Sequence, residues 1–186
     1  MNVALKTDTH GATKTDKHAS ISLLPTHPGS WTQYSFEEVF KLGRKDVEDL
    51  QLAAMQLRFD QLKNGVAALD RLAKKQGVTR IDSFADALPL FFDHRVYKSY
   101  PLTIIENRDF AKLTSWLNRL TLHDLSKMDL SGLTTLDEWL DRLENYGMLI
   151  GHSTGTTGKL SFIPRSRVEW PAWHASYRQA SRAATG

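Results

Sequence analysis

Apolar residues recur at steps of mostly three and four through much of the chain, which is the repeat of an amphipathic helix. The longest such run covers residues 45–76, where Lys, Arg, Asp and Gln occupy the opposite face. This pattern predicts one long helix, with a bend at Gly65 and a C-terminal cap at Gly77. We expect its apolar stripe to pack on its own domain, while binding to a partner protein or a membrane is the alternative.

The same repeat, together with start and stop signals, predicts four shorter helices. Thr135 and Glu138 form a capping box, in which each side chain caps the backbone of the other residue, at the start of one of them. Pro89 is expected to stop an earlier helix, because proline lacks the backbone N–H that continues a helix. The four predicted helices cover residues 35–42, 83–88, 107–122 and 135–146.

The helical repeat changes after Gly147. Apolar segments at 148–150 and 160–163 flank a run of small and hydroxyl-bearing residues, which predicts a strand, a tight loop and a second strand. A last helix follows, and it begins either at a second capping box, Ser166 to Glu169, or at Pro171 as its first residue. The chain is therefore predicted to be mainly α-helical, with a short β-hairpin.

The first thirty residues differ from the rest of the chain. They are rich in Thr, His and Lys, and their few apolar residues show no period, so we predict a disordered leader over 1–30. Its His10, His18 and His27 lack the spacing of metal ligands. The predicted organisation is this leader, a helical region over 31–147, and a strand–loop–strand–helix unit over 148–186.

Composition narrows the functional classes. The 186 residues contain no cysteine, which excludes disulfides, thiolate metal sites and cysteine nucleophiles. With 24 basic and 21 acidic residues, the net charge of +3 is too small and too dispersed to indicate a nucleic-acid partner. No segment is apolar for long enough to insert into a membrane, and no secretory signal pattern opens the chain. A cytoplasmic location is the resulting prediction.

The loop between the two predicted strands carries most of the candidate chemistry. Its glycines can adopt positive φ angles and turn backbone N–H groups toward an anion, and its hydroxyls can donate hydrogen bonds to phosphate oxygens. A lysine adds positive charge at the end of the loop, and Arg165 is a further candidate cation. The candidate phosphate-binding residues are Ser153, Thr154, Gly155, Thr156, Thr157, Gly158 and Lys159.

The spacing of this loop separates it from two common nucleotide-binding patterns. The P-loop pattern would need a glycine at Ser153 and a hydroxyl residue at Leu160. The dinucleotide fingerprint fails as well, because no helix opens after Gly158. The run Ser-Thr-Gly-Thr-Thr-Gly over 153–158 instead resembles the phosphate-binding signature of the adenylate-forming (AMP-binding, acyl-CoA synthetase-like) superfamily, usually written Thr-Ser-Gly-Thr-Thr-Gly. The residues that follow this run, 159–164, most resemble those of the phenylacetate-CoA ligase and acyl-protein synthetase branch.

The resemblance implies a parent protein with an α/β fold, of which this chain is an N-terminal fragment that lacks the rest of the adenylation domain. It implies an enzyme that uses ATP and Mg²⁺ to convert a carboxylic acid substrate into an acyl-adenylate. The acyl group then passes to CoA or another thiol, amine or protein acceptor. The catalytic residues and the ligands of Mg²⁺ would lie outside these residues, so that the isolated chain would be inactive.

Two departures weaken the match. The first two hydroxyl residues of the loop are exchanged, and Ser161 stands where many relatives keep a lysine. The pyrophosphate contact could therefore fall to Lys159 or Arg165. A glycine- and threonine-rich run can also be a plain hairpin loop, and the alternative function is a non-catalytic helical module that binds another protein.

Three other clusters contain residue types that occur in functional sites. The segment 94–101 combines basic residues and tyrosines that could contact an acidic ligand, and Lys98, Tyr100 and Pro101 resemble landmarks ahead of the phosphate loop in phenylacetate-CoA ligase-like proteins. His123 and Asp124 are adjacent, so a catalytic pair is not expected, because neighbours in sequence do not face each other on a helix. The acidic residues between 129 and 141 are spaced too irregularly for a metal site.

Overall fold

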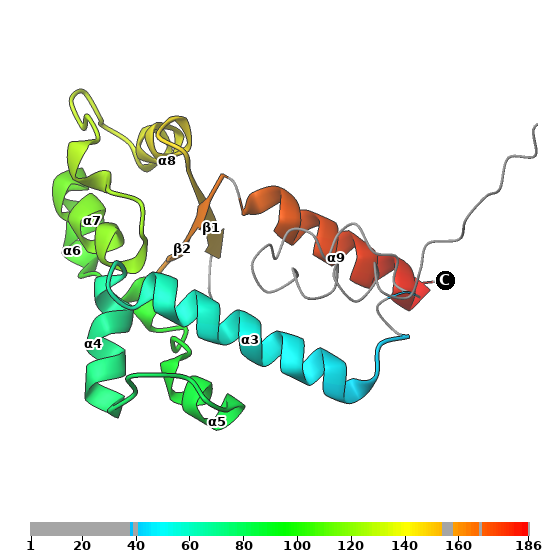
Figure 1. Ribbon diagram of the computed structural model, residues 1–186. Coiled ribbons are helices and arrows are strands. Elements are labelled where there is room, and N and C mark those ends of the chain that lie inside the picture. The colour runs from blue at the N-terminus through cyan, green and yellow to red at the C-terminus, as the bar shows by residue number, and fades with distance from the viewer. Residues whose placement is uncertain (1–37, 39–40, 154–157, 168, 186) are drawn as a thin grey trace, which may run out of the picture.

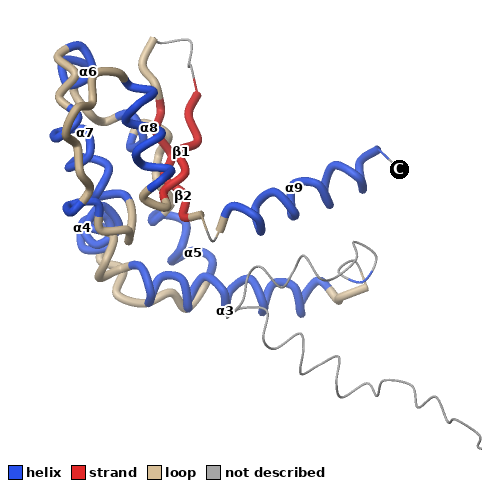
Figure 2. The backbone as a smooth tube through the Cα atoms, turned by 90° about the horizontal axis from the view of Figure 1, so that it is seen from above, coloured by secondary structure: helices blue, strands red, loops and turns tan. Residues whose placement is uncertain are grey.

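The computed structural model describes residues 38, 41–153, 158–167 and 169–185. The predicted leader over 1–30 lies outside the described residues, as does most of the helix predicted over 35–42. The described chain is mainly helical with one two-stranded antiparallel hairpin, as predicted. Helices α6, α7 and α8 lie to one side of the hairpin, and α3 and α9 both extend away from it to the other side (Figures 1 and 2).

The elements follow one another in a simple order. The α-helices are α3 (Arg44–Leu62), α4 (Ala67–Gln76), α5 (Phe84–Ala87), α6 (Leu102–Glu106), α7 (Phe110–Leu117), α8 (Leu136–Asn145) and α9 (Trp170–Thr185). Short 3₁₀ turns lie between them: η2 (Leu88–Leu90), η3 (Val96–Lys98), η4 (Asn118–Leu120) and η5 (Leu125–Lys127). The strands are β1 (Met148–Ser153) and β2 (Ser161–Ser166), each longer than its predicted apolar segment.

The prediction of one continuous helix over 45–76 was wrong, since α3 and α4 are separate helices. The backbone N–H groups of Gly65 and Val66 both bond to the carbonyl of Leu62, which closes a turn instead of another helical repeat. Val66 is extended (φ −95°, ψ 99°) and only 6% exposed, so the break buries this side chain at the start of α4. Gly77 does cap α4 in the left-handed conformation, with φ 69°, as predicted.

The helix predicted over 107–122 is shorter in the structure, where α7 covers only Phe110–Leu117. An additional helix, α6, opens directly after Pro101, and a turn with Arg108 at φ 52° separates it from α7. The carboxylate of Asp109 accepts the N–H of Lys112 and so caps α7 at a new start. The helix then tightens into η4, which ends the regular pattern before residue 122.

The other helix signals gave mixed results. The capping box at α8 is confirmed, because Glu138 N–H donates to Thr135 Oγ1 over 3.2 Å and Thr135 N–H donates to Glu138 Oε2 over 3.0 Å. The α-helix before Pro89 ends at Ala87, close to the predicted end, although the chain continues through the proline as the 3₁₀ turn η2. Proline is tolerated there because the first turn of a helix needs no N–H donor from it.

The main core lies between the hairpin and helices α7 and α8. Trp139, Leu113, Leu117 and Phe162 are fully buried in it. The rings of Trp139 and Phe162 meet edge to face at a centroid distance of 5.5 Å. The indole N–H of Trp139 donates to Thr114 Oγ1 over 2.8 Å, which satisfies a polar group in the middle of this core. A smaller second cluster packs α3 and α4 against α5.

The two strands pair antiparallel with Met148 opposite Ser166 and Ser153 opposite Ser161. This register places Met148, Ile150, Phe162 and Pro164 on the same face of the hairpin. Helix α8 packs beside β1 on the core side, where Met148 is 1% exposed. No third strand pairs with the hairpin within the described residues. The hairpin thus holds the two ends of the loop together.

Candidate functional site

The candidate phosphate loop joins the ends of β1 and β2. Ser153, the last residue of β1, is exposed and pairs with Ser161, the first residue of β2. Thr154, Gly155, Thr156 and Thr157 lie outside the described residues, so the site is built here from its two flanks. The paired strands fix those flanks next to each other, which is the arrangement that the sequence predicted for this segment.

Gly158 begins the described part of the loop's exit. Its φ angle is +71°, in the left-handed region that side chains disfavour, and it is exposed. Within the described residues no atom lies within 4 Å of the position that a Cβ atom would take. The requirement for glycine here therefore comes from the backbone conformation and not from crowding.

Lys159 does not extend into the loop. Its ammonium donates a hydrogen bond to the backbone carbonyl of Tyr100 and lies 4.6 Å from the centre of the Tyr100 ring. The side chain is half-buried. The charge predicted to contact phosphate is thus used, in this structure, to attach the loop exit to the segment before α6.

Tyr100 receives this lysine and is itself fixed by the core. It is 1% exposed, and its phenol donates to the carbonyl of Leu160 over 2.8 Å. Its ring packs against Trp116 and Phe162, at centroid distances of 5.0 and 5.4 Å. Burial raises the pKa of the Tyr100 phenol, which keeps it protonated as a donor. The landmark tyrosine therefore contacts both residues that follow Gly158.

Arg165 is separated from the loop. It lies opposite Leu149, four residues along β2 from Ser161, which corresponds to about 13 Å of extended strand. Its guanidinium lies 5.0 Å from the centre of the Trp173 ring on α9. The structure thus does not bring together Lys159 and Arg165, the two cations that the sequence suggested.

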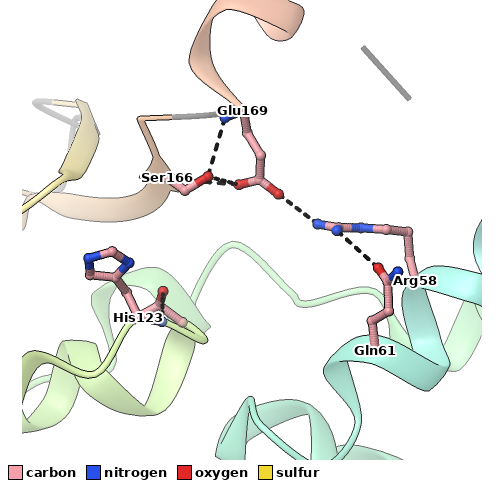
Figure 3. Close-up of polar contacts among 6 residues, drawn as sticks. Arg58, Gln61, His123, Ser166 and Glu169 are labelled. Atoms are coloured by element: carbon pink, nitrogen blue, oxygen red, sulfur yellow. Dashed lines mark hydrogen bonds and ion pairs between the residues drawn. The ribbon is translucent and has the colours of Figure 1, made fainter. Parts of the chain in front are cut away.

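A second polar cluster lies at the junction of β2 and α9. Glu169 stands between Ser166 and Arg58 (Figure 3): it accepts the Ser166 hydroxyl over 2.9 Å and forms an ion pair with Arg58 over 2.6 Å. Burial by itself would raise the pKa of Glu169, but the hydrogen bonds from Ser166 and the charge of Arg58 outweigh it, and the net pKa is below its usual value.

The two hydrogen bonds of the predicted second capping box form, but Ser166 is the last residue of β2 and not the start of the helix. Helix α9 begins at Trp170, so neither of the two predicted starts is the observed one. Arg58, Ser166 and Glu169 line a cavity of about 460 Å³, together with His123 and apolar side chains of α3 and α4. The sequence predicted the Ser166–Glu169 box but not the ion pair, because Arg58 lies 111 positions away on another helix. No local signal connects the two.

The remaining candidates do not form a catalytic arrangement. His123 Nε2 lies 3.0 Å from the carbonyl of Tyr146, at the C-terminal end of α8, while Asp124 accepts the N–H and hydroxyl of Ser126. Asp93 is paired with Arg95 in the segment before η3. Across the described ranges, no group of three or more His, Asp or Glu residues could hold a metal ion.

Comparison of the chain with protein-family models, curated proteins and solved structures found no match. In the part of the chain that the structure describes, every helix is too short or too polar to cross a bilayer.

Proposed function

We propose that this chain supplies the phosphate-binding loop of an ATP-dependent, AMP-forming ligase that activates a carboxylic acid. The observation that carries the proposal is Gly158, which has a positive φ angle at the exit of a hydroxyl-rich loop between two paired strands. Such a conformation lets consecutive backbone N–H groups face one anion. Because residues 153–158 resemble the adenylate-forming signature, we infer that this anion is the triphosphate of ATP.

In this proposal the loop holds ATP while the acid attacks. The hydroxyls of residues 153, 154, 156 and 157 and the backbone N–H groups donate to the β- and γ-phosphate oxygens. When bound, Mg²⁺ would neutralise part of the phosphate charge, with ligands from outside these residues. The acyl group would pass to CoA or to another thiol, amine or protein acceptor, in a parent protein of the α/β class.

Lys159 has a positioning role in the proposed site. Its ammonium is bonded to the Tyr100 carbonyl, and the Tyr100 phenol is bonded to the next residue, Leu160. Because these two contacts attach the loop exit to a buried side chain, they keep Gly158 at a fixed place before ATP arrives. Preorganised donors stabilise developing charge better than donors that must be ordered on binding.

The test uses ATP–pyrophosphate exchange in the protein encoded by the complete reading frame around this sequence. We expect Gly158→Val to abolish exchange, because valine is strained at positive φ and its side chain would point at the phosphates. The matched control is Gly77→Val, an equally exposed glycine with φ 69° at the end of α4. Exchange near the wild-type rate in folded Gly158→Val would overturn the proposal.

The second candidate function is a module that binds another protein, and one observation favours it. Helix α9 exposes Trp173 and Tyr177, which are 41% and 64% accessible and stacked on each other at 6.0 Å. Aromatic side chains of this kind are enriched where proteins associate. Analytical sedimentation of the wild-type chain and of the double variant Trp173→Ser/Tyr177→Ser tests association through α9. Association that rises with concentration and is lost in the variant supports the module. A wild-type chain that stays monomeric at all concentrations contradicts self-association through α9.

A further inference from the structure

A groove beside Trp116 contains none of the candidate phosphate-loop residues in its lining. It has a volume of about 350 Å³ and is lined by α4, η4 and the segment around η3. Three basic side chains, Arg71, Lys75 and Arg119, contribute to its lining, and no acidic side chain does. We call these residues, with the apolar side chains between them, the basic groove.

The three cations of the basic groove take part in no ion pair with the residues that the structure describes. Within the described residues no carboxylate forms an ion pair with any of them, although Lys74, next to Lys75, is paired with Asp70 over 2.8 Å. Many exposed arginines elsewhere in the chain are paired, among them Arg80 with Asp82 and Arg95 with Asp93. The groove thus gathers three positive charges with no acidic side chain in its lining.

Two of these cations are neighbours on the surface of α4. Arg71 and Lys75 are four residues apart on α4, so their side chains share one helix face. Like charges in this relationship repel each other and destabilise a helix. Arg119 adds a third positive charge from η4, which packs against α4. An anion bound between them would remove this repulsion.

The apolar part of the groove includes two aromatic side chains, Phe92 and Trp116. Trp116 is 4% exposed, and its indole N–H already donates to Ser99 Oγ over 2.9 Å. The indole thus needs no further polar partner and presents an apolar surface. Leu72 and Phe92 also line the groove and are half-buried. A ligand that fits must combine an apolar body with negative charge.

We propose that the basic groove binds a small amphipathic anion, which is a flat apolar group that carries a carboxylate or a phosphate. The apolar group would lie against Leu72, Phe92 and Trp116, and the anion would be held by Arg71, Lys75 and Arg119. The volume is at the small end of the range of ligand pockets, about 300–1,000 Å³, which favours a compact ligand. This inference stands independently of the proposed ATP site, since it uses none of the loop residues.

Calorimetric titration of the chain with two probes, 2-naphthoate and 1-naphthyl phosphate, tests the groove and separates the two anion classes. The neutral analogue 2-naphthol measures the contribution of the apolar body alone. We expect saturable one-to-one binding of at least one anion, much weaker binding of naphthol, and an affinity that falls as salt is added. Binding should also shift the indole N–H resonance of Trp116 in the NMR spectrum, assigned with Trp116→Phe.

The charged residues are tested with the triple variant Arg71→Gln/Lys75→Gln/Arg119→Gln, which should weaken anion binding roughly tenfold or more. The control Lys74→Gln/Arg80→Gln/Lys112→Gln removes the same charge from exposed positions outside the groove, and it should bind the probe like the wild type. Circular dichroism checks that both variants are folded before their binding is compared.

Three results would overturn the proposal. They are the absence of saturable binding by either anion, equal loss of binding in the control variant, and naphthol binding as tight as that of the anions. The first of these results is tested further with a single-stranded RNA 12-mer, by asking whether the RNA binds and whether its binding depends on the groove cations. RNA binding that depends on these cations, without binding of either naphthyl anion, would assign the groove to a nucleic acid.

Discussion

The phenol of Tyr100 donates a hydrogen bond to the backbone carbonyl of Leu160 over 2.8 Å, although the two residues are 60 positions apart in the sequence. This bond, with the contact of Lys159 to the Tyr100 carbonyl, attaches the exit of the candidate phosphate loop to the main core. It makes Tyr100 the residue on which the position of the loop exit depends.

Tyr100→Phe should lower the free energy of unfolding by about 1 kcal/mol, because it removes one hydrogen bond from a partly buried carbonyl and keeps the ring packing. Urea denaturation measures the change. Tyr177→Phe is the control, since Tyr177 is 64% exposed and should lose no stability. Equal stability of Tyr100→Phe and the wild type would show that water replaces the phenol at Leu160.

Thr114→Val should destabilise the chain by about 1–3 kcal/mol, since it leaves the indole N–H of Trp139 without an acceptor inside the core. Thr114→Ser keeps the acceptor and should retain most of that stability. In the background of Trp139→Phe, the cost of Thr114→Val should largely disappear, because the donor is gone. A cost that persists in that background would point to packing at Thr114 as the cause.

Glu169 should make stability depend on pH in the acid range. Its pKa in the folded chain is below the usual value of 4.5, so the carboxylate contributes stability above that value. This contribution is lost as the pH falls from the usual carboxyl pKa through the lower folded one. The difference in unfolding free energy between wild type and Glu169→Gln should therefore shrink from pH 6 to pH 3.

Arg58→Gln separates the two sources of that effect. In this variant the Glu169 carboxylate keeps only the hydrogen bonds from Ser166. The dependence of the unfolding free energy on pH should therefore be smaller but still present. NMR titration of the Glu169 side chain in both proteins follows its pKa directly. An unchanged pKa in Arg58→Gln would mean that the ion pair does not form in solution.

Gly77→Ala should lower the free energy of unfolding by about 1 kcal/mol, because Gly77 has φ 69° and alanine is disfavoured in the left-handed region. Gly77→Asn should cost less, since asparagine tolerates this conformation. Thermal or urea unfolding of the three proteins gives the order of stability. Alanine as stable as glycine would show that the end of α4 adopts another conformation in solution.

Short-range signals in the sequence determined the ends of several elements. Thr135 and Glu138 are three residues apart and cap each other, and Gly77 is the residue that a left-handed cap requires. The strand–loop–strand pattern after Gly147 likewise follows from neighbouring residues. These features could be predicted because the interacting groups lie within a few positions of one another, where the geometry of a helix or hairpin fixes their distance.

Tertiary packing decided the rest. The apolar repeat over 45–76 fits one helix, but burial of Val66 at the start of α4 outweighs that local preference and divides it. The sequence predicted that Lys159 would contact phosphate. In the folded chain its ammonium instead contacts the carbonyl and the ring of Tyr100. Folding brings distant segments together, and this pairs Arg58 with Glu169 and places Arg71 near Arg119. The repeat of apolar residues along the chain cannot predict such contacts, because it reflects only neighbouring positions.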